Sequence, residues 1–580
     1  MHYVARTSGI IAFLLLSTHA YAAQVASISE IQGEGHFSPL VGTVVRTTGV
    51  VTQLVGDNNF FLQAEPDGND LTSDGILIRA SRKLGVKIGD LVTIEGSVDE
   101  DSGRYPQLST TVIRETVLMS RKPDAVLPEP LEIGMNGRMP PTELAYDGGL
   151  YDPTRTGADF YESLEGMLVS ISRPIVAGPT SKDDQGTFYI VAERGAGATN
   201  VNSLGGLTIA PGDSNPERMK VLASKADTPN LQVAVGDTFE HLTGIVTYDA
   251  LGAYGITLKT FTGYTAVPRE QSTVVAATNG ELDIASYNVE NLDPVVERLD
   301  KVIDKDEIDD DVTAGKFSGI ATHIVDVLKS PAIVALQEVQ DNDGAEYSDV
   351  SAGNVTLSTL IEAIKAAGGP TYIGLELAPA DDEVGGQAGA NIHAAFLYDP
   401  ARVSQSTEAL TFIEAAAFAD SRLPLVALFT HNGRKVWVIN VHFSSKSGSD
   451  PAYGTVQPPR DASEIRRIGQ ARAVRDFVRE LPPEDRVVIV GDFNTYWFEQ
   501  PLLLLTGGQH PLENLALRDP PEERISYVFD GSSQSLDHAL VRLEPGDSAV
   551  LSTPHVNSIF PVKTRMSDHD PKHVVLTFAD

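Results

Sequence analysis

From residue 281 onward, polar residues repeatedly follow short apolar segments of the kind that form buried strands. In "RVVIVGDFN", residues 486–494, the apolar run Val487–Val490 is followed by Gly491, Asp492 and Asn494. One strand end of this kind indicates a turn, because Gly, Asp and Asn are common turn residues. Repetition of the pattern constrains the fold more strongly, since polar strand ends can meet at one edge of a sheet.

Six segments share this pattern: "LDIASYNVENL", "AIVALQEVQ", "VWVINVHFSSK", "VVIVGDFN", "SLDHAL" and "SDHDP". Helical segments lie between them, among them 461–481, where Asp461 and Glu464 have the spacing of a capping box. We therefore expect residues 281–580 to form a layered α/β domain with a site assembled at one edge.

The residue types at these strand ends limit the chemistry. Carboxylates and carboxamides without thiols suit Mg²⁺, Mn²⁺ or Ca²⁺ better than zinc. Histidines beside carboxylates suit proton transfer. The chain has no G-x-S-x-G nucleophile elbow and no Walker-type loop. A metal, an acid/base pair and Asn donors together are what hydrolysis of a phosphodiester requires.

The ordered motifs "SYNVENL", "LQEV", "NVHFSSK", "GDFN", "LDH" and "SDHDP" resemble the endonuclease/exonuclease/phosphatase superfamily, which has the deoxyribonuclease I-like fold. The segments "NIHAAFLYDP", "DSRLPLVALF" and "GGPTY" resemble its secreted bacterial branch, extracellular nucleases with leading OB-like domains. The resemblance is dense over 281–580 and weaker towards the front. It implies a four-layered α/β sandwich with two central sheets.

The resemblance also implies roles for the strand ends. Glu338 is the expected main metal ligand, and Asn288 and Asp568 are expected to help hold metal or phosphate. Asp492 and Asn494 are expected to orient the attacking water and the phosphate.

Two histidines complete the set that the resemblance implies. His442 and His569 are expected to flank the scissile phosphate, and Asp537 to orient His569. Either Asp492 or His569 takes the proton from water, and the sequence leaves that choice open. The products would carry 5′-phosphate and 3′-hydroxyl ends.

Substrate contacts are predicted less directly. Arg422 in "DSRLPL" matches a family position that contacts substrate phosphate, and we expect Lys446 to do the same. Residues 434–475 hold eight Lys or Arg against three Asp or Glu, which is either a phosphate-tracking patch or a solvated helix face. In "GGQAGANIH", His393 stands where the family branch has arginine, and we expect it to be structural.

The front of the chain reads as two small β domains. "IGDLVTIEGSV" and "VGDTFEHLTGIV" resemble one another, and Gly49, Gly96 and Gly244 lie within strand patterns where bends or bulges are expected. We expect OB-like domains at 24–120 and 158–268, joined by a Pro-rich linker at 121–157. Their function is open between single-strand binding and a purely architectural role.

Residues 1–22 have the features of a secretory signal peptide, so we expect an exported protein, periplasmic or extracellular. No cysteine is available for disulfides, and the formal charge of −35 argues against a generic basic nucleic-acid binder. The cofactor we expect is Mg²⁺, with Mn²⁺ or Ca²⁺ as alternatives. Structural calcium is a second interpretation of the acidic segments 65–75 and 304–311, which also fit solvated loops.

Three functions remain open from the sequence. The first is a secreted, metal-dependent, non-specific nuclease acting on DNA, with RNA as a further substrate. The second is an enzyme of the same fold that cleaves a phospholipid head group or a small phosphodiester. The third is a non-catalytic protein that binds through its OB-like domains. We expect no membrane association and no protein partner, and a monomer.

Overall fold

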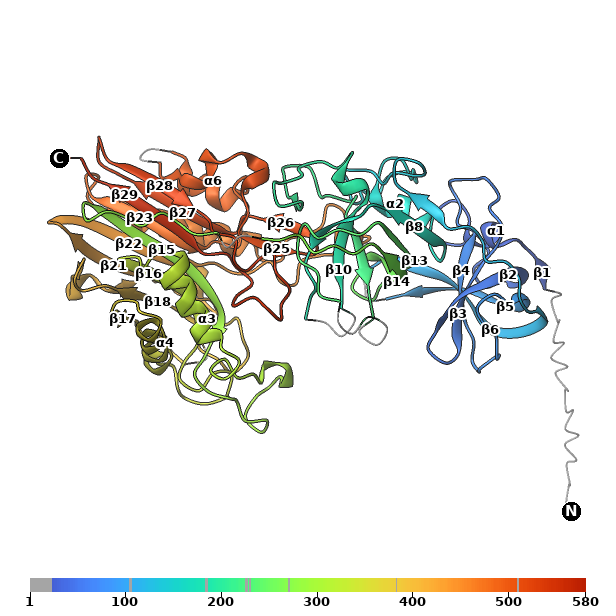
Figure 1. Cartoon of the computed structure of the whole chain (residues 1–580), viewed down its shortest axis with the longest axis horizontal. Helices are drawn as coiled ribbons and strands as arrows, with labels where there is room; N and C mark the ends of the chain where they lie inside the picture. The colour runs from blue at the N-terminus through green and yellow to red at the C-terminus, as the bar shows by residue number, and fades with distance from the viewer. Residues whose placement is uncertain are drawn as a thin grey trace, which may run out of the picture.

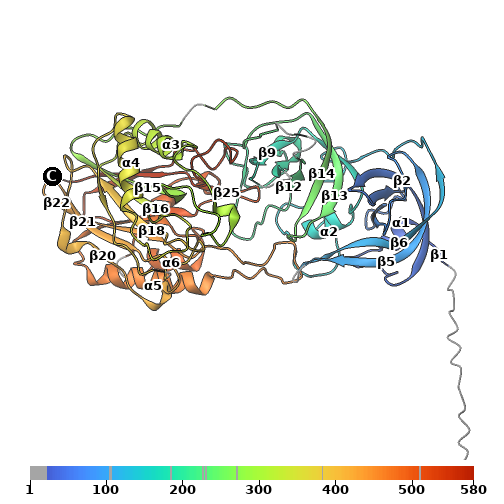
Figure 2. The ribbon, with the colours of Figure 1, turned by 90° about the horizontal axis from the view of Figure 1, so that it is seen from below.

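The structure is a computed structural model that describes residues 23–103, 107–182, 186–224, 228, 231–269, 272–381, 383–508 and 511–579. The expected signal peptide, 1–22, lies outside these residues. The chain forms two β units followed by a larger α/β domain, arranged in a row (Figures 1 and 2). Within the described residues, we find no helix with the length and apolar character to span a bilayer.

The first β unit is a closed five-stranded barrel. Its strands pair in the order β2-β3-β4-β6-β5, and β2 also pairs with β5, which closes the sheet. The short β1 (Gln24–Val25) and α1 (Ile28–Gln32) precede it. The barrel strands are β2 (Val44–Val55), β3 (Asn59–Gln63), β4 (Gly75–Arg79), β5 (Leu91–Ser102) and β6 (Ser109–Lys122).

The second β unit repeats this path. Its strands pair in the order β8-β13-β14-β12-β10-β9. The two end strands of this order, β8 (Leu168–Ser172) and β9 (Ile175–Gly178), follow one another directly in the sequence. The two units also share a parallel pair at the matching position, β4 with β6 and β12 with β14. The remaining strands are β10 (Phe188–Val191), β12 (Met219–Leu222), β13 (His241–Tyr248) and β14 (Tyr254–Thr262).

Glycines mark corresponding bulges in the two units. The register shifts beside Gly96 in β5 and beside Gly244 in β13. A Cβ at Gly96 would lie 2.5 Å from the Arg114 carbonyl oxygen, and one at Gly244 would lie 2.4 Å from that of Thr257. A small closed barrel with glycine bends fits the expected OB-like architecture.

The expected linker, 121–157, is shorter than predicted. Strand β7 (Leu131–Ile133) pairs with β8, and Ile133 is fully buried in the core of the second unit. Helix α2 (Gly157–Glu162) also packs in this core. The prolines in this segment indicated a linker, but Leu131 pairs with Val169 on β8. The second unit therefore begins near Leu131.

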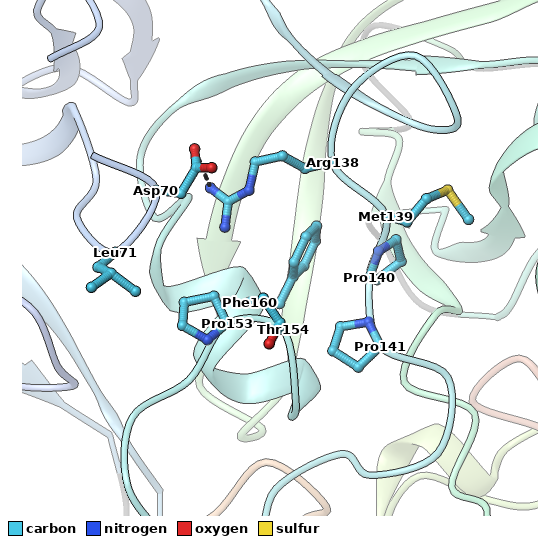
Figure 3. A pocket seen from close by; sticks show the side chains of 9 residues that line it. All are labelled: Asp70, Leu71, Arg138, Met139, Pro140, Pro141, Pro153, Thr154 and Phe160. Carbon is cyan, nitrogen blue, oxygen red and sulfur yellow. Dashed lines mark ion pairs between the residues drawn. The ribbon is translucent and has the colours of Figure 1, made fainter. Parts of the chain in front are cut away.

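The interface between the two β units has an apolar and a polar part. The apolar part is a buried cluster of Phe61, Leu77, Val112, Leu168 and Ile245. His36 of the first unit contacts Asp159 (Nε2 to Oδ1, 2.7 Å) and Glu162 (Nδ1 to Oε2, 3.3 Å) on α2. Beside this contact is a cavity of about 290 Å³, where the Arg138 guanidinium lies over the Phe160 ring (Figure 3).

The C-terminal domain is a four-layered α/β sandwich, as expected. One sheet has the order β17-β18-β16-β15-β29-β28 and the other β19-β21-β22-β23-β27-β24. Their strands are β15 (Glu281–Leu292), β16 (Ile333–Val339), β17 (Ile373–Leu375), β18 (His393–Tyr398), β19 (Ser404–Gln405), β21 (Leu425–His431), β22 (Arg434–His442), β23 (Arg486–Asp492), β24 (Glu513–Asn514), β27 (Asp537–Arg542), β28 (Ser548–Ser552) and β29 (Lys572–Thr577).

Helices cover the outer faces of both sheets. Helices α3 (Lys316–Thr322) and α4 (Asn354–Ala366) pack on the first, and α5 (Glu464–Glu480) and α6 (Gln500–Thr506) pack on the second. A separate apolar core fills the space between the sheets. Helix α5 begins after Ser463, two residues later than the expected cap Asp461. The Asp461 carboxylate accepts from the backbone N–H of Ser463 (3.0 Å) and also pairs with Lys446 and Arg467.

Candidate active site

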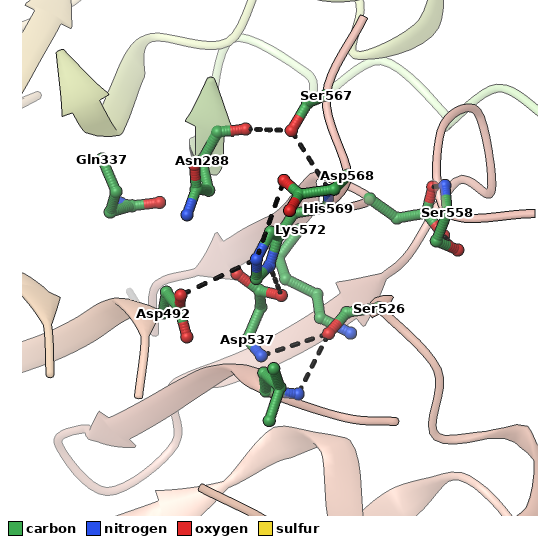
Figure 4. Close-up of polar contacts among 12 residues, drawn as sticks. Asn288, Gln337, Asp492, Ser526, Asp537, Ser558, Ser567, Asp568, His569 and Lys572 are labelled. Carbon is green, nitrogen blue, oxygen red and sulfur yellow. Dashed lines mark hydrogen bonds and ion pairs between the residues drawn. The ribbon is translucent and has the colours of Figure 1, made fainter. Parts of the chain in front are cut away.

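Both sheets deliver polar residues to the same edge of the sandwich. Asn288 lies near the end of β15, Glu338 near the end of β16, and His442 and Asp492 at the ends of β22 and β23. The loop before β29 adds a further pair, and Figure 4 shows several of these side chains converging. The structure thus brings together the expected set: Asn288, Glu338, His442, Asp492, Asn494, Asp537, Asp568 and His569.

One half of the site is built from acidic and amide oxygens. Glu338 accepts a hydrogen bond from Nδ2 of Asn288 (3.0 Å) and another from the backbone N–H of Asn291 (3.1 Å). Burial raises the pKa of Glu338, and the charge of Asp568 raises it further. Oδ1 of Asp568 is buried without a hydrogen-bond partner. The unpartnered oxygen of Asp568 and the repulsion between Asp568 and Glu338 fit a hard divalent cation, which Glu338, Asp568 and Asn288 would hold.

The backbone is distorted where it presents these ligands. Glu338 has a φ of +59°, which is rare for a residue with a side chain. Strand pairing shifts register between Leu336 and Val339, and also between Asn288 and Leu292 on β15. Such bulges redirect side chains and are common beside active sites.

The other half of the site is an acid/base group. Nδ1 of His569 lies 2.7 Å from Oδ2 of Asp537, and its Nε2 lies 3.7 Å from Asp492. Burial alone would lower the pKa of His569, but Asp537, Asp568 and Asp492 raise it well above its usual value. Burial raises the pKa of Asp492 to about 7. One oxygen or nitrogen from each of Asp492, Asp537 and His569 lies within 4.8 Å of the others.

His442 occupies the space between the two halves. Its Nε2 lies 3.7 Å from Glu338 and 3.5 Å from Asp492. Nε of Arg422 donates to its Nδ1 (3.3 Å), so the neutral ring carries its proton on Nε2 and can donate into the site. Burial lowers the pKa of His442 well below its usual value, and the charges of Arg422 and His569 lower it further.

Asn494 locks Asp492 in place. Its backbone N–H donates to Oδ1 of Asp492 (2.8 Å), and its Nδ2 donates to Oδ2 (3.1 Å). Gly491 precedes this pair with a φ of +142°, and a Cβ there would lie 1.9 Å from the Val441 carbonyl oxygen. The "GDFN" motif therefore requires its glycine, because β22 and β23 approach too closely for any side chain.

The two expected phosphate-binding cations are already engaged. Nζ of Lys446 pairs with Asp461 (2.9 Å) and Glu499 (2.7 Å), so its charge is neutralised within the protein. Arg422 donates to His442 and to the carbonyl oxygen of Phe443 (2.8 Å). Both residues line the cleft described below, so their expected contact with substrate phosphate stays a prediction.

His393 is structural, as expected. The ring bridges the backbone carbonyl oxygen of Asn391 (2.8 Å) and the carboxylate of Glu376 (2.8 Å), and it is buried. The acidic segment 304–311 contributes Asp309 and Asp311 to a carboxylate cluster with Asp293, apart from the active-site residues.

Several supporting residues escaped the sequence analysis. Asp570 accepts hydrogen bonds from the backbone N–H groups of 556–558 and fixes the loop that carries Asp568 and His569. The Tyr527 ring packs 4.7 Å from the His569 ring. The "SDHDP" motif hinted at Asp570, whereas nothing near Tyr527 in sequence marked it. His538 points away from the site and binds the Thr495 carbonyl oxygen (3.0 Å).

A cleft of about 1030 Å³ is lined by six of the expected residues: Glu338, His442, Asp492, Asn494, Asp568 and His569. Its walls come partly from the second β unit, through Tyr189, Arg218, Lys220 and Tyr254. The site is therefore open to a ligand, and the ligand would meet two domains.

Comparison with known proteins agrees with this geometry. The model of the endonuclease/exonuclease/phosphatase family matches residues 285–569. The C-terminal domain of this chain belongs to that family. Family members are phosphodiesterases and nucleases, which generally use a divalent metal ion. A second model, a domain of unknown function (DUF8508), matches residues 132–268, the extent of the second β unit. No curated protein matched the sequence.

Solved structures similar to the chain cover about half of it. A D. rerio TDP2 humanized by 14 mutations is 16% identical and covers 52% of this chain and 100% of its own, with a TM-score of 0.36. D. rerio TDP2 complexed with a single-strand DNA product is 16% identical and covers 51% and 99%, with a TM-score of 0.35. The human Nocturnin catalytic domain is 13% identical and covers 52% and 97%, with a TM-score of 0.35.

Proposed function

We propose that this protein is a secreted, metal-dependent nuclease that hydrolyses phosphodiester bonds of DNA, with RNA as a further substrate. Its role would be to degrade nucleic acid outside the cytoplasm for nutrient or phosphate scavenging. One observation carries the proposal: both halves of the site line one cleft, and Nε2 of His442 lies within 4 Å of a carboxylate from each half, Glu338 and Asp492.

In this proposal, one half of the site holds the metal ion and the phosphate. Glu338, Asp568 and Asn288 would hold Mg²⁺, which would offset negative charge on the phosphate. Nε2 of His442 faces the same position and can donate a hydrogen bond to a phosphate oxygen.

The acid/base half orients the attacking water and accepts its proton. Asn494 fixes the Asp492 carboxylate, which orients the attacking water, and Asp537 holds His569 with Nε2 towards the cleft. The proton of the water passes to Asp492 or His569.

The proposal is tested with purified mature protein, a mixture of native and heat-denatured DNA, and Mg²⁺. Release of acid-soluble nucleotides should stop with EDTA and in a Glu338→Ala variant. The DNA remaining intact with Mg²⁺, Mn²⁺ and Ca²⁺ would refute the nuclease proposal. Release of phosphocholine from sphingomyelin in a parallel assay would instead support the lipid-directed alternative.

A further inference from the structure

The second β unit is fixed against the catalytic domain and forms a wall of its cleft. Strand β11 (Leu207–Thr208) pairs with β26 (Ser532–Gln534) of the catalytic domain. Beside it, Asp530 accepts hydrogen bonds from the Tyr189 hydroxyl (2.8 Å, to Oδ1) and from Nε of Arg218 (2.6 Å, to its backbone carbonyl oxygen). The wall is therefore built by backbone pairing as well as by side chains.

A second connection joins the catalytic domain to the second β unit. The segment that follows His442 extends to the second β unit, where Tyr453 is buried in that unit's core. The Tyr248 hydroxyl donates to the backbone carbonyl oxygen of Tyr453 (3.1 Å). Residues 445–453 also line the cleft, so its width is limited by two connections between the domains.

The cleft is small for a double helix. About 1030 Å³ is close to the upper size of small-molecule pockets. The major groove of a duplex alone is about 12 Å wide and 8.5 Å deep. A few unpaired nucleotides fit such a space better than a helix.

The cleft is lined by three arginines, Arg218, Arg422 and Arg460, but neither of its two lysines is free to bind phosphates. Lys220 pairs with Asp249 (2.6 Å), and Lys446 pairs with two carboxylates, so both charges are neutralised within the protein. Binding to a duplex depends mainly on free cations along its phosphates.

Aromatic rings lead away from the catalytic residues. Tyr527 and Phe529 both line the cleft and are nearly parallel, with 10° between their planes and 6.3 Å between centroids. Tyr527 itself lies against His569, and Phe529 is 54% exposed. Unpaired bases stack on such rings, whereas the base faces within a duplex are already stacked.

We infer that the cleft selects single-stranded nucleic acid, with unpaired bases next to the scissile phosphate stacking on Tyr527 and Phe529. The inference rests on the proposed nuclease function and names the substrate class of that same site. The second β unit is then a specificity-determining wall.

Cleavage is measured on one labelled 20-mer, single-stranded or annealed to its complement, and on the same backbone with abasic residues. Wild-type kcat/KM should be at least tenfold higher on the single strand than on the duplex. Phe529→Ala should lower kcat/KM on the single strand roughly 5- to 150-fold, the loss equivalent to one stacked base. On the abasic strand, kcat/KM of Phe529→Ala should stay within twofold of the wild type.

Phe37→Ala is the matched control, because Phe37 is 62% exposed on the first β unit. Equal rates on duplex and single strand would overturn the inference, as would an equal loss on the abasic strand. Fluorescence anisotropy with Glu338→Gln measures binding without cleavage, so the inference is tested even if no strand is cut. Tighter binding of the single strand supports it, and equal binding of the duplex overturns it.

Discussion

Replacing Asp537 by asparagine tests the contact that orients His569. Asp537 and His569 are 3% and 5% exposed, and 2.7 Å separates Oδ2 from Nδ1. Asparagine keeps the size and one acceptor oxygen but removes the charge. A hydrogen bond to a charged group contributes about 1.5–3 kcal/mol. If the transition state loses that amount, kcat falls roughly 10- to 150-fold, at about 1.4 kcal/mol for each factor of ten.

The assay is steady-state hydrolysis of a single-stranded oligonucleotide at saturating Mg²⁺. Asp537→Asn should lower kcat with little change in KM, because Asp537 lies behind His569 rather than against the substrate. Asp537→Ala, which also loses the acceptor oxygen, should be at least as slow. Asp519→Asn, at an exposed position, is the control. A kcat for Asp537→Asn within twofold of wild type would refute the role assigned to this pair.

Three further outcomes follow from the structure. Mg²⁺ at 100 times its Kd should stabilise the wild type by about 2.7 kcal/mol in thermal unfolding, and Glu338→Gln should abolish the shift; an equal shift in the variant would contradict the metal assignment. Burial alone would lower the pKa of His36, but Asp159 and Glu162 raise it to about 9. Protonated His36 therefore stabilises the folded state fully below pH 6.5, and up to about 3 kcal/mol of this stability is lost as the pH rises to 9. In urea unfolding, the stability of His36→Gln should depend less on pH than that of the wild type. Gly491→Ala should lower stability by more than about 2 kcal/mol, whereas Gly280→Ala, with nothing within 4 Å of its Cβ, should stay within about 0.5 kcal/mol in the same urea experiment.

Four of the expected site residues were predictable because each lies at or near the end of an apolar strand: Asn288, Glu338, His442 and Asp492. Asp537 instead begins β27, and Asp568 and His569 lie in the loop before β29, so the family resemblance identified them rather than a strand pattern. The strand pattern of Val487–Val490 and the polar residues after it are local features, and the same holds for Asn288 and Glu338. Strand ends in one sandwich meet at common edges, so the sequence order of the motifs was enough to predict their convergence.

Features that depend on distant pairing were not predictable. Asp461 has the spacing of a helix cap, but the helix begins after Ser463, and Asp461 also pairs with the distant Lys446. Ile465 fits the apolar period of that helix and is nonetheless 86% exposed.

The wall of the cleft illustrates the same limit. Tyr189 and Asp530 are 341 residues apart, and no local pattern connects them. Lys446 follows His442 in a family motif, yet its partners Asp461 and Glu499 come from two later segments. The sequence predicted which residues form the site, whereas contacts with distant residues determine which charges are paired within the protein.

Mass spectrometry of a short single-stranded oligonucleotide digested in H₂¹⁸O with Mg²⁺ tests the central claim most directly. The account predicts fragments with 5′-phosphate ends that carry one ¹⁸O from the attacking water, produced by the wild type and not by Glu338→Ala. An intact oligonucleotide, or equal digestion by Glu338→Ala, would contradict it.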